Sequence, residues 1–372
     1  MHIEHQSVLD NILARGRYRR LIPQDGVDFS SNDYLGLAGS ARIKRAIVDA
    51  IERCVPVGSG GSRLLRGNHA EHEALEAEAA AFFGTEAALF FSSGFAANGA
   101  LFASLPQRGD LVVYDELIHA SVHDGIRLGR AQSVAAAHND ANAFDDAIRD
   151  WRRNGGIGRI WIAAESLYSM DGDRAPIDGL AEIADRHDGF LVIDEAHATG
   201  VFGPDGRGLG AHLDGRDNVI SLHTCGKALG CEGALLTGPA FMREFLINRG
   251  RGFIFSTAPS PLMASAVREA LRILADEPER RDRLAALAED ARAQLVPLGG
   301  GAHPSQIIPV ILGDDVRAMQ AAAAVQRAGY DVRGIRPPTV PAGTARLRVS
   351  ITLNATHADV AGLSEAIAQA LR

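Results

Sequence analysis

The pattern of apolar and polar positions between about residue 70 and residue 240 alternates short apolar runs with helical stretches. Such alternation is typical of an α/β unit with a largely parallel sheet, because parallel strands are joined by crossover helices. Short apolar runs bounded by turn signals indicate strands that are buried in a core. The predicted strands are residues 87–91, 110–114, 159–163, 190–194 and 218–222.

The pattern changes after about residue 262. A long stretch rich in Arg, Glu, Ala and Leu continues to about residue 298 and predicts helix. A smaller α+β unit is expected beyond it. Its predicted elements are a strand at 305–312, a helix over 318–329, a strand near Val332, a strand at 346–352 and a closing helix from Ala358.

Length and composition agree with a globular protein of more than one unit. With 372 residues, of which 46% are hydrophobic, the chain can bury a large core. We expect an N-terminal segment (1–36), a large domain (37–262) and a C-terminal α+β domain (263–372). No run of about 18 apolar residues predicts a membrane helix, and the first residues lack the pattern of a signal peptide. We therefore expect a cytoplasmic protein with no membrane partner.

The net charge of −8 at pH 7 argues against a nucleic-acid partner, because a phosphate backbone requires a basic face. Two local basic clusters stand out against this charge. One contains Arg15, Arg17, Arg19 and Arg20, and the other contains Arg249 and Arg251. Either cluster would steer an anionic substrate or would simply be solvated surface charge, and the sequence leaves both interpretations open.

The three cysteines, Cys54, Cys225 and Cys231, lie in hydrophobic or glycine-rich sequence. This context predicts reduced thiols that pack as small hydrophobic side chains. Their spacing matches no common zinc pattern, so we expect no metal site.

Only two residues are lysine, Lys44 and Lys227, although Lys and Arg together number 38. Lysine is chemically distinct because its amine can lose a proton and form a Schiff base, whereas arginine stays protonated. Lys44 lies in a helical pattern whose polar stripe predicts a solvated charge. Lys227 lies between glycines in a stretch with no other charge, where burial would lower its pKa. Lys227 is therefore the candidate nucleophile.

Asp194 and His197 end one predicted strand, and Lys227 follows the next strand along the chain. Enzymes that use pyridoxal 5′-phosphate (PLP) need a lysine to hold the aldehyde and an acid to pair with the ring nitrogen. Asp194 is the candidate acid. Taken singly, Asp194 also suits a helix N-cap or turn, and His197 also suits a hydrogen-bonded core histidine. Their coincidence with Lys227 favours a PLP site.

A PLP site also requires donors for the phosphate. Ser93, Gly94 and Phe95 follow a predicted strand and open a helix, whose first amides bind anions, and Thr224 offers a hydroxyl. The glycine-rich segment 58–63 lacks the Gly-Lys-Ser/Thr ending of a P-loop and is interpreted as a loop near the site. No Gly-x-Gly-x-x-Gly turn follows the first strand, which argues against a dinucleotide-binding dehydrogenase.

Nearly the whole chain resembles the α-oxoamine synthases, which are PLP enzymes of the type I aminotransferase fold. This resemblance implies a large domain with a mostly parallel seven-stranded sheet and a small α+β C-terminal domain. The matching segments are residues 29–36, 58–62, 93–98, 119–121, 169–173, 194–197, 226–227 and 336–348.

The resemblance implies a role for each matching cofactor residue. Lys227 would carry PLP as a Schiff base and then act as the base on the substrate. The other implied contacts are Asp194 to the ring nitrogen, His197 and Ser169 to the phenolic oxygen, His119 on the ring face, and Gly94, Phe95 and Thr224 to the phosphate.

The resemblance also implies substrate contacts. Arg348 would bind the amino acid carboxylate, for which its planar fork is suited, while Arg346 is expected to be an exposed strand charge. Asn32 and Thr339 match further substrate positions. The N-terminal segment is short for the family, and Arg19 is our choice among its arginines.

Within the family, the Arg336–Arg348 segment most resembles the branch that condenses L-alanine with a pimeloyl thioester in biotin synthesis. The donor would be pimeloyl-CoA or a pimeloyl-carrier protein, which the sequence does not separate. Sister enzymes that use glycine are the nearest alternative, and a non-catalytic binding protein is a further one. The family also implies a homodimer, in which Ser256 and Thr257 would reach the partner's phosphate.

Overall fold

The computed structural model describes residues 3–372, and their contacts group into two compact units. The larger unit holds Leu35–Ser169 and Asp173–Asp282. The smaller unit holds the described residues up to Tyr34, the short segment Met170–Gly172 and Arg283–Arg372.

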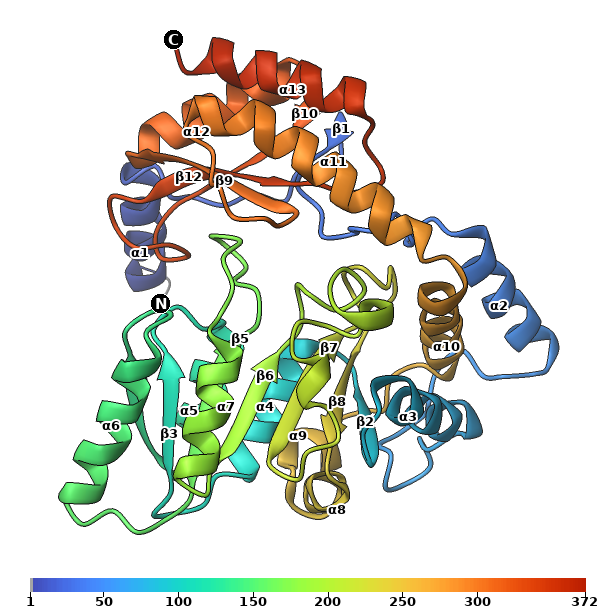
Figure 1. Ribbon diagram of the computed structural model, residues 1–372. Coiled ribbons are helices and arrows are strands. Elements are labelled where there is room, and N and C mark those ends of the chain that lie inside the picture. The colour runs from blue at the N-terminus through green and yellow to red at the C-terminus, as the bar shows by residue number, and fades with distance from the viewer. Residues whose placement is uncertain (1–2) are drawn as a thin grey trace. The chain divides into compact units, whose positions relative to one another are not determined.

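A seven-stranded sheet forms the centre of the larger unit, in the order β2-β8-β7-β6-β5-β3-β4 (Figure 1). β8 is antiparallel to both of its neighbours and every other pair is parallel, which confirms the mostly parallel sheet. The five predicted strands are all present, within two residues of their predicted bounds. The strands are β2 (Ala87–Phe91), β3 (Leu111–Asp115), β4 (Gln132–Ala136), β5 (Ile160–Glu165), β6 (Phe190–Asp194), β7 (Val219–Thr224) and β8 (Ala234–Gly238).

Helices cover both faces of this sheet. They are α2 (Ala41–Glu52), α3 (Ala70–Phe83), α4 (Gly94–Ser104), α5 (Ala120–Leu128), α6 (Ala141–Arg153), α7 (Ile177–Arg186), α8 (Ala240–Arg249), α9 (Arg251–Ile254) and α10 (Pro261–Asp276). Lys44 is exposed on α2, as predicted.

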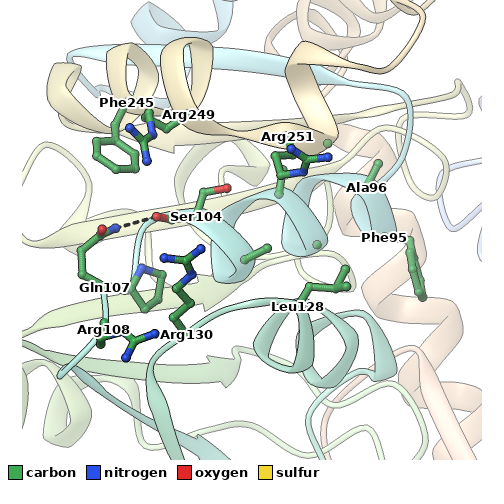
Figure 2. Close-up of a pocket in the computed structure, with 15 residues that line it drawn as sticks. Phe95, Ala96, Ser104, Gln107, Arg108, Leu128, Arg130, Phe245, Arg249 and Arg251 are labelled. Atoms are coloured by element: carbon green, nitrogen blue, oxygen red, sulfur yellow. Dashed lines mark hydrogen bonds between the residues drawn. The ribbon is translucent and has the colours of Figure 1, made fainter.

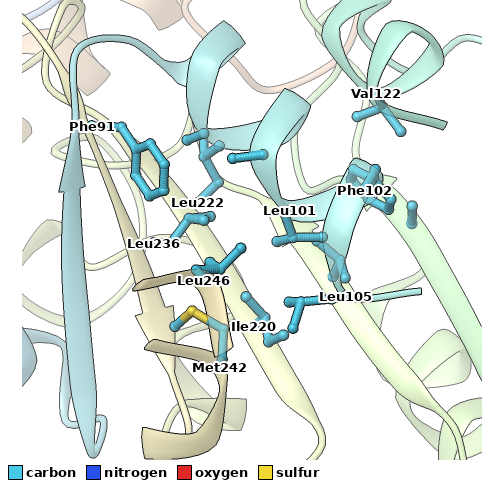
Figure 3. Packing of buried hydrophobic residues seen from close by; sticks show 14 of the residues in the cluster. Phe91, Leu101, Phe102, Leu105, Val122, Ile220, Leu222, Leu236, Met242 and Leu246 are labelled. Carbon is cyan, nitrogen blue, oxygen red and sulfur yellow. The ribbon is translucent and has the colours of Figure 1, made fainter. Parts of the chain in front are cut away.

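Side chains of each strand alternate between the two faces, and both faces are buried. Val112 of β3 packs in a cluster with α4, α5 and α8, which Figure 3 shows around Leu101, Leu222 and Met242. Leu111 belongs to the opposite cluster, with α6 and α7. Full burial of one such leucine side chain contributes roughly 1.5–3 kcal/mol to the free energy of unfolding. The two clusters therefore hold the strands, and the residues at their ends, firmly in place.

The smaller unit contains a three-stranded antiparallel sheet in the order β11-β12-β9 and a short parallel pair of β1 with β10. These elements confirm the predicted α+β character. The strands are β1 (Val27–Asp28), β9 (Ile307–Gly313), β10 (Tyr330–Asp331), β11 (Arg333–Ile335) and β12 (Ala345–Ser350), and the helices are α1 (Ile3–Ala14), α12 (Asp315–Arg327) and α13 (His357–Ala370).

The long helical stretch predicted up to residue 298 is two helices, α10 and α11 (Glu279–Leu295). Pro278 separates them, because proline has no amide hydrogen to donate and disfavours helical geometry in the residue before it.

The cysteine prediction was right for Cys225 and wrong for Cys54. All three thiols are free, and Cys225 is buried. Cys54 is exposed just after α2 with a φ of 62°, so it forms part of a tight helix end and not of the core. Among residues 3–372, no helix is long and apolar enough to cross a membrane.

Candidate active site

Lys227 lies beside His197 in the larger unit. The Nζ atom of Lys227 is 2.6 Å from Nε2 of His197, which is buried. The residues follow β7 and β6, which are parallel neighbours, so both side chains emerge at the same edge of the sheet. The structure therefore brings these two predicted site residues together.

Asp194, the last residue of β6, is buried and held from two directions. Its Oδ2 atom accepts a hydrogen bond from Nδ2 of Asn98 on α4 at 2.9 Å, and its Oδ1 atom accepts one from the amide of Ala196 at 3.0 Å. The turn role of Asp194 is therefore observed, and it is compatible with the predicted site role. The side chain can cap the turn with one oxygen while the carboxylate keeps a fixed orientation.

A chain of hydrogen bonds connects Asp194 with His119. Asn98 donates to Oγ of Ser121 at 3.0 Å, and that oxygen lies 2.8 Å from Nδ1 of His119. The amide of Ser121 also donates to Nδ1 at 3.3 Å. Nδ1 is therefore an acceptor, which leaves the proton of the neutral ring on Nε2.

No role was predicted from the sequence for Asn98 or Ser121. A signal was present, because Asn98 is a polar residue within the apolar sequence of α4 and is 2% exposed. Buried amides of this kind need hydrogen-bond partners, so the side chain had to meet polar groups at the sheet edge.

His119 has a lowered pKa. Although the residue is accessible to solvent, surrounding protein atoms displace much of the water around its ring, and this desolvation is the main cause. The charge of Lys227 lowers the pKa further, while the carboxylate of Asp194 opposes the effect. His119 is therefore neutral at pH 7.

Glu165, the last residue of β5, is the register partner of Asp194 in the parallel pair. Burial raises its pKa to about 8, and the charge of Asp194 adds to this while Lys227 opposes it. Its Oε2 atom accepts a hydrogen bond from the amide of Ser169 at 3.3 Å. Glu165 therefore keeps its proton at neutral pH, next to the carboxyl group of Asp194.

Gly94 and Thr224, two of the residues predicted to bind a phosphate, lie close together at the start of α4. Ser93 caps α4 by accepting from the amide of Ala96 at 3.1 Å, which leaves the first amides of the helix at the sheet edge. A Cβ atom on Gly94 would lie 3.6 Å from Leu222 Cδ2 and 3.8 Å from Oγ1 of Thr224, so any longer side chain would fill the space between Gly94 and Thr224. These residues fit a phosphate at the start of α4.

His138 fixes the segment that carries Ser169. Its ring nitrogens lie 2.9 Å from Oδ1 of Asp115 and 2.7 Å from Oδ2 of Asp173. Burial alone would lower the pKa of His138, but hydrogen bonds and charges from both carboxylates outweigh it and raise the pKa to about 10. The amide of Tyr168 donates to the carbonyl of Asp173 at 2.9 Å, which closes the turn around Ser169.

In the smaller unit, the structure places Arg348 with Asn32 and Arg19 with Thr339. Arg348 on β12 is buried and donates to Oδ1 of Asn32 at 3.1 Å and to Oγ of Ser350 at 2.6 Å. Arg19 donates to Oγ1 of Thr339 at 3.4 Å. Each of the four residues predicted to contact the substrate is thus hydrogen-bonded to another of the four.

The prediction that Arg346 is an exposed strand charge was wrong. Its side chain is buried on β12 because it forms an ion pair with Asp171 and donates to the carbonyls of Thr344 and Met170, at 2.9 and 3.2 Å. A buried guanidinium needs such partners, and no local pattern around Arg346 indicated that Asp171 would supply one.

Comparisons with known proteins identify the family of the chain. The family described as aminotransferase class I and II matches residues 24–367. An 8-amino-7-oxononanoate synthase from Anaeromyxobacter sp. (strain K) is 44% identical over 348 residues, which cover 93% of this chain and 86% of that protein.

Two solved structures are similar over most of their length. A serine palmitoyltransferase from S. paucimobilis, with a PLP–myriocin adduct bound, has a TM-score of 0.89 at 26% identity and covers 99% of this chain and 97% of its own. An 8-amino-7-oxononanoate synthase from Francisella tularensis has a TM-score of 0.78 at 28% identity. The match covers 93% of this chain and 98% of that protein.

Proposed function

The chain belongs to the aminotransferase class I and II family, and within it to the α-oxoamine synthases, and we propose that it condenses L-alanine with a pimeloyl thioester. The products are 8-amino-7-oxononanoate, carbon dioxide and the free thiol, as a step of biotin synthesis. The observation that carries the choice of substrates is the 44% identity over 93% of the chain with a synthase of that name.

The residues of the larger unit fit PLP as the cofactor. Lys227 offers the amine, Asp194 the acid for the ring nitrogen, and the amides of Gly94 and Phe95 with Thr224 the phosphate site. When bound, PLP supplies an electron sink that stabilises negative charge at the substrate Cα. We assign His119 to the ring face, and His197 with Ser169 to the phenolic oxygen.

Lys227 has two tasks in this proposal, since it holds the cofactor and afterwards removes the Cα proton of L-alanine. His197, 2.6 Å away, keeps Nζ at a fixed position for the transfer. Arginine performs neither task because its guanidinium does not lose a proton.

His119 serves the acyl transfer and the loss of carbon dioxide. Because it is neutral, with the proton on Nε2, it can donate a hydrogen bond to an oxygen that gains negative charge. A protonated ring would bring a net positive charge next to Lys227. The lowered pKa of His119 therefore supports a role as a hydrogen-bond donor at neutral pH.

Arg348 binds the carboxylate of L-alanine. Its guanidinium is already oriented by Asn32 and Ser350, which reduces the conformational freedom lost on binding. Two parallel hydrogen bonds to a carboxylate also give directional specificity. Thr339 and Arg19 are the further substrate contacts in this proposal.

We also propose a homodimer that works in the cytoplasm. Several large apolar side chains of the larger unit are exposed, including Leu65 at 83% and Phe255 at 71%. Exposed apolar side chains that gather in one patch are typical of a protein interface. Phe255 precedes Ser256 and Thr257, the residues assigned to the partner's phosphate. Sedimentation velocity at micromolar protein would give the mass of a dimer if this is correct.

The test of the reaction uses purified protein with PLP, first titrated with L-alanine and with glycine, and then supplied with pimeloyl-CoA. The visible absorption should respond to L-alanine at lower concentration than to glycine. Mass spectrometry should then detect 8-amino-7-oxononanoate, with one carbon dioxide released per product.

A stronger response to glycine, with product formed from a shorter acyl-CoA, would assign the chain to a sister synthase. Absence of any cofactor band would instead favour the non-catalytic alternative, and turnover with a pimeloyl-carrier protein but not with the CoA thioester would change the donor.

A further inference from the structure

A cavity of about 480 Å³ begins at Phe95 and follows α4 in the larger unit. Figure 2 shows the side chains of four arginines around it: Arg108, Arg130, Arg249 and Arg251. Phe95 also belongs to the proposed phosphate site, which the partner subunit completes in the proposed homodimer. The cavity is therefore part of the site already described, whereas the hydrogen bonds of His138 form within one chain and join two of its segments.

His138 lies between two turns, each of which carries a predicted cofactor residue. On one side is Asp115, the last residue of β3, from which a short turn leads to His119 at the N-cap of α5. On the other side is Asp173, whose carbonyl closes the turn around Ser169. The ring nitrogens lie 2.9 and 2.7 Å from these two carboxylates, so one side chain links the turn of His119 to the turn of Ser169.

Asn139, the next residue, makes a second link between the same carboxylates. Its amide donates to Oδ2 of Asp115 at 2.8 Å, and its side-chain Nδ2 atom donates to Oδ2 of Asp173 at 2.6 Å. The φ of Asn139 is 56°, a left-handed conformation that asparagine adopts more readily than most residues. The chain therefore takes an uncommon conformation at the position where amide and side chain bind different carboxylates.

The Asp115 end of this link also holds the turn that leads to His119. Oδ1 of Asp115 accepts a hydrogen bond from the amide of Leu117 at 2.9 Å, and Oε1 of Glu116 accepts one from the amide of His138 at 3.1 Å. A displacement of His138 would therefore be transmitted to the backbone just before His119.

The His138 ring is protonated at neutral pH. Burial alone would lower its pKa, but the hydrogen bonds and charges of Asp115 and Asp173 outweigh this effect and raise the pKa to about 10. Both ring nitrogens therefore donate, and a rigid planar ring with two donors fixes the direction of its two acceptors. The ring of Tyr168 packs edge-on against it at a centroid distance of 4.5 Å and restrains its plane.

Stability alone explains this group poorly, because buried ion pairs often contribute no more than well-packed apolar residues of similar volume would. We propose that His138 is a positioning residue of the PLP site: by joining the two turns, it holds His119 against the ring face and Ser169 at the phenolic oxygen. The inference rests on the proposed roles of His119 and Ser169. Loss of the link should disturb both contacts together.

A double-mutant cycle on the dissociation constant of PLP, measured by cofactor titration, tests this role. His138→Gln should raise the constant about tenfold, the effect of one lost hydrogen bond to a charged group. Ser169→Ala and His119→Asn should also raise it, and asparagine keeps a cap for α5. In the Ser169→Ala/His119→Asn variant, His138→Gln should have little further effect, because the side chains that it positions are absent. A purely structural role would instead give the same factor in both backgrounds.

The visible absorption of the PLP-loaded protein gives a second readout. It should change in His138→Gln in the same direction as in Ser169→Ala, since both variants weaken the contact with the phenolic oxygen. Asn139→Gly is a milder variant that keeps the left-handed φ and both bonds of His138 but loses the side-chain bond to Asp173. It should change the absorption and the dissociation constant in the same direction by less. Wild-type absorption in both variants would overturn the proposal.

His187→Gln is the matched control, because it breaks a similar bond in the same unit. Nε2 of His187 lies 2.7 Å from Oδ1 of Asp145, and the His187 side chain is 14% exposed, against 23% for that of His138. This pair joins α6 to the end of α7 and not the turns of the site. Both variants should lower the stability in urea, but only His138→Gln should change the affinity for PLP. An equal effect of both variants on that affinity would overturn the positioning role.

The same measurements separate this inference from the proposed function. If Ser169→Ala and His119→Asn bind PLP as the wild type does, the proposed roles of these two residues are wrong and the role of His138 falls with them. If they bind PLP more weakly but His138→Gln has the same effect in both backgrounds, their roles stand and the positioning role is wrong. Neither result depends on which amino acid or thioester reacts, so failure of the proposed reaction would leave the inference standing.

Discussion

The amine of Lys227 lies 2.6 Å from Nε2 of His197, although 30 residues separate them in the chain. The two follow neighbouring parallel strands, β7 and β6, so their contact is a direct consequence of the sheet order. It leaves Lys227 at the same edge of the sheet as Asp194, with His197 in contact with its amine. This arrangement makes the role of Lys227 the first point to test.

Replacement of Lys227 by alanine or by arginine should abolish covalent attachment of PLP and nearly all turnover, because neither side chain offers an amine that can lose a proton. Reduction with borohydride followed by peptide mass spectrometry checks the attachment. Lys44→Ala, which changes the other lysine of the chain, is the control and should behave as the wild type. A normal rate in Lys227→Arg would contradict the assignment.

Asn98→Ala should weaken the cofactor site and the fold together. The change removes the donor to Asp194 and to Ser121, so a buried carboxylate loses one of its hydrogen bonds. We expect the free energy of unfolding to fall by about 1–3 kcal/mol and the dissociation constant of PLP to rise. Urea denaturation and cofactor titration measure the two effects. Asn142→Ala, on the exposed side of α6, should change neither, and equal PLP affinity in Asn98→Ala would contradict the role of the hydrogen-bond chain.

The strands that the sequence pattern predicted are those buried on both faces, since continuous apolar runs distinguish them. β4 was not predicted because it lies at the sheet edge, where four of its five residues are exposed and the run is not apolar. β8 is apolar but short, and lies between glycines, which are equally typical of a loop. Its antiparallel pairing depends on contacts distant in sequence.

The candidate site was predictable where a residue type has a narrow chemical use, as for Lys227, Asp194 and His197. Residues that act by positioning another side chain were not predictable in this way. His138 gives no local signal of its two carboxylate partners, which are 23 and 35 residues away. Arg346 was misjudged for the same reason, because the burial of a charged side chain depends on a partner that only the folded chain brings close.

Glu165→Gln should stabilise the cofactor-free protein at alkaline pH. The pKa of Glu165 in the folded protein, about 8, is above the ordinary value of 4.5, so between these values the folded state keeps a proton that the unfolded state has released. The free energy of unfolding of the wild type therefore falls as pH rises, by up to about 1.4 kcal/mol per pH unit from this group. Glutamine resembles the protonated carboxyl and carries no such dependence.

Urea denaturation of both proteins between pH 5 and pH 9 measures this difference. The two stabilities should be similar near pH 5, and the variant should be more stable by a few kcal/mol at pH 8 and above. Glu165→Ala is the comparison, since it removes the same carboxyl but should be less stable than Glu165→Gln at every pH because of the cavity that it opens. Parallel curves for the wild type and Glu165→Gln would show that Glu165 is ionised at neutral pH.

Asp171→Asn should destabilise the smaller unit and impair alanine binding, because it leaves the buried guanidinium of Arg346 without its carboxylate. We expect a loss of about 2–4 kcal/mol, below the upper end for buried pairs since the Asp171 side chain is 30% exposed. The KM for L-alanine should rise, since Arg346 and Arg348 project from the same face of β12. Because removing both charges leaves none unpaired, Asp171→Leu/Arg346→Met should recover most of the stability. Additive losses in the double-mutant cycle of Asp171→Leu, Arg346→Met and the double variant, measured by urea denaturation, would show that the two residues act independently.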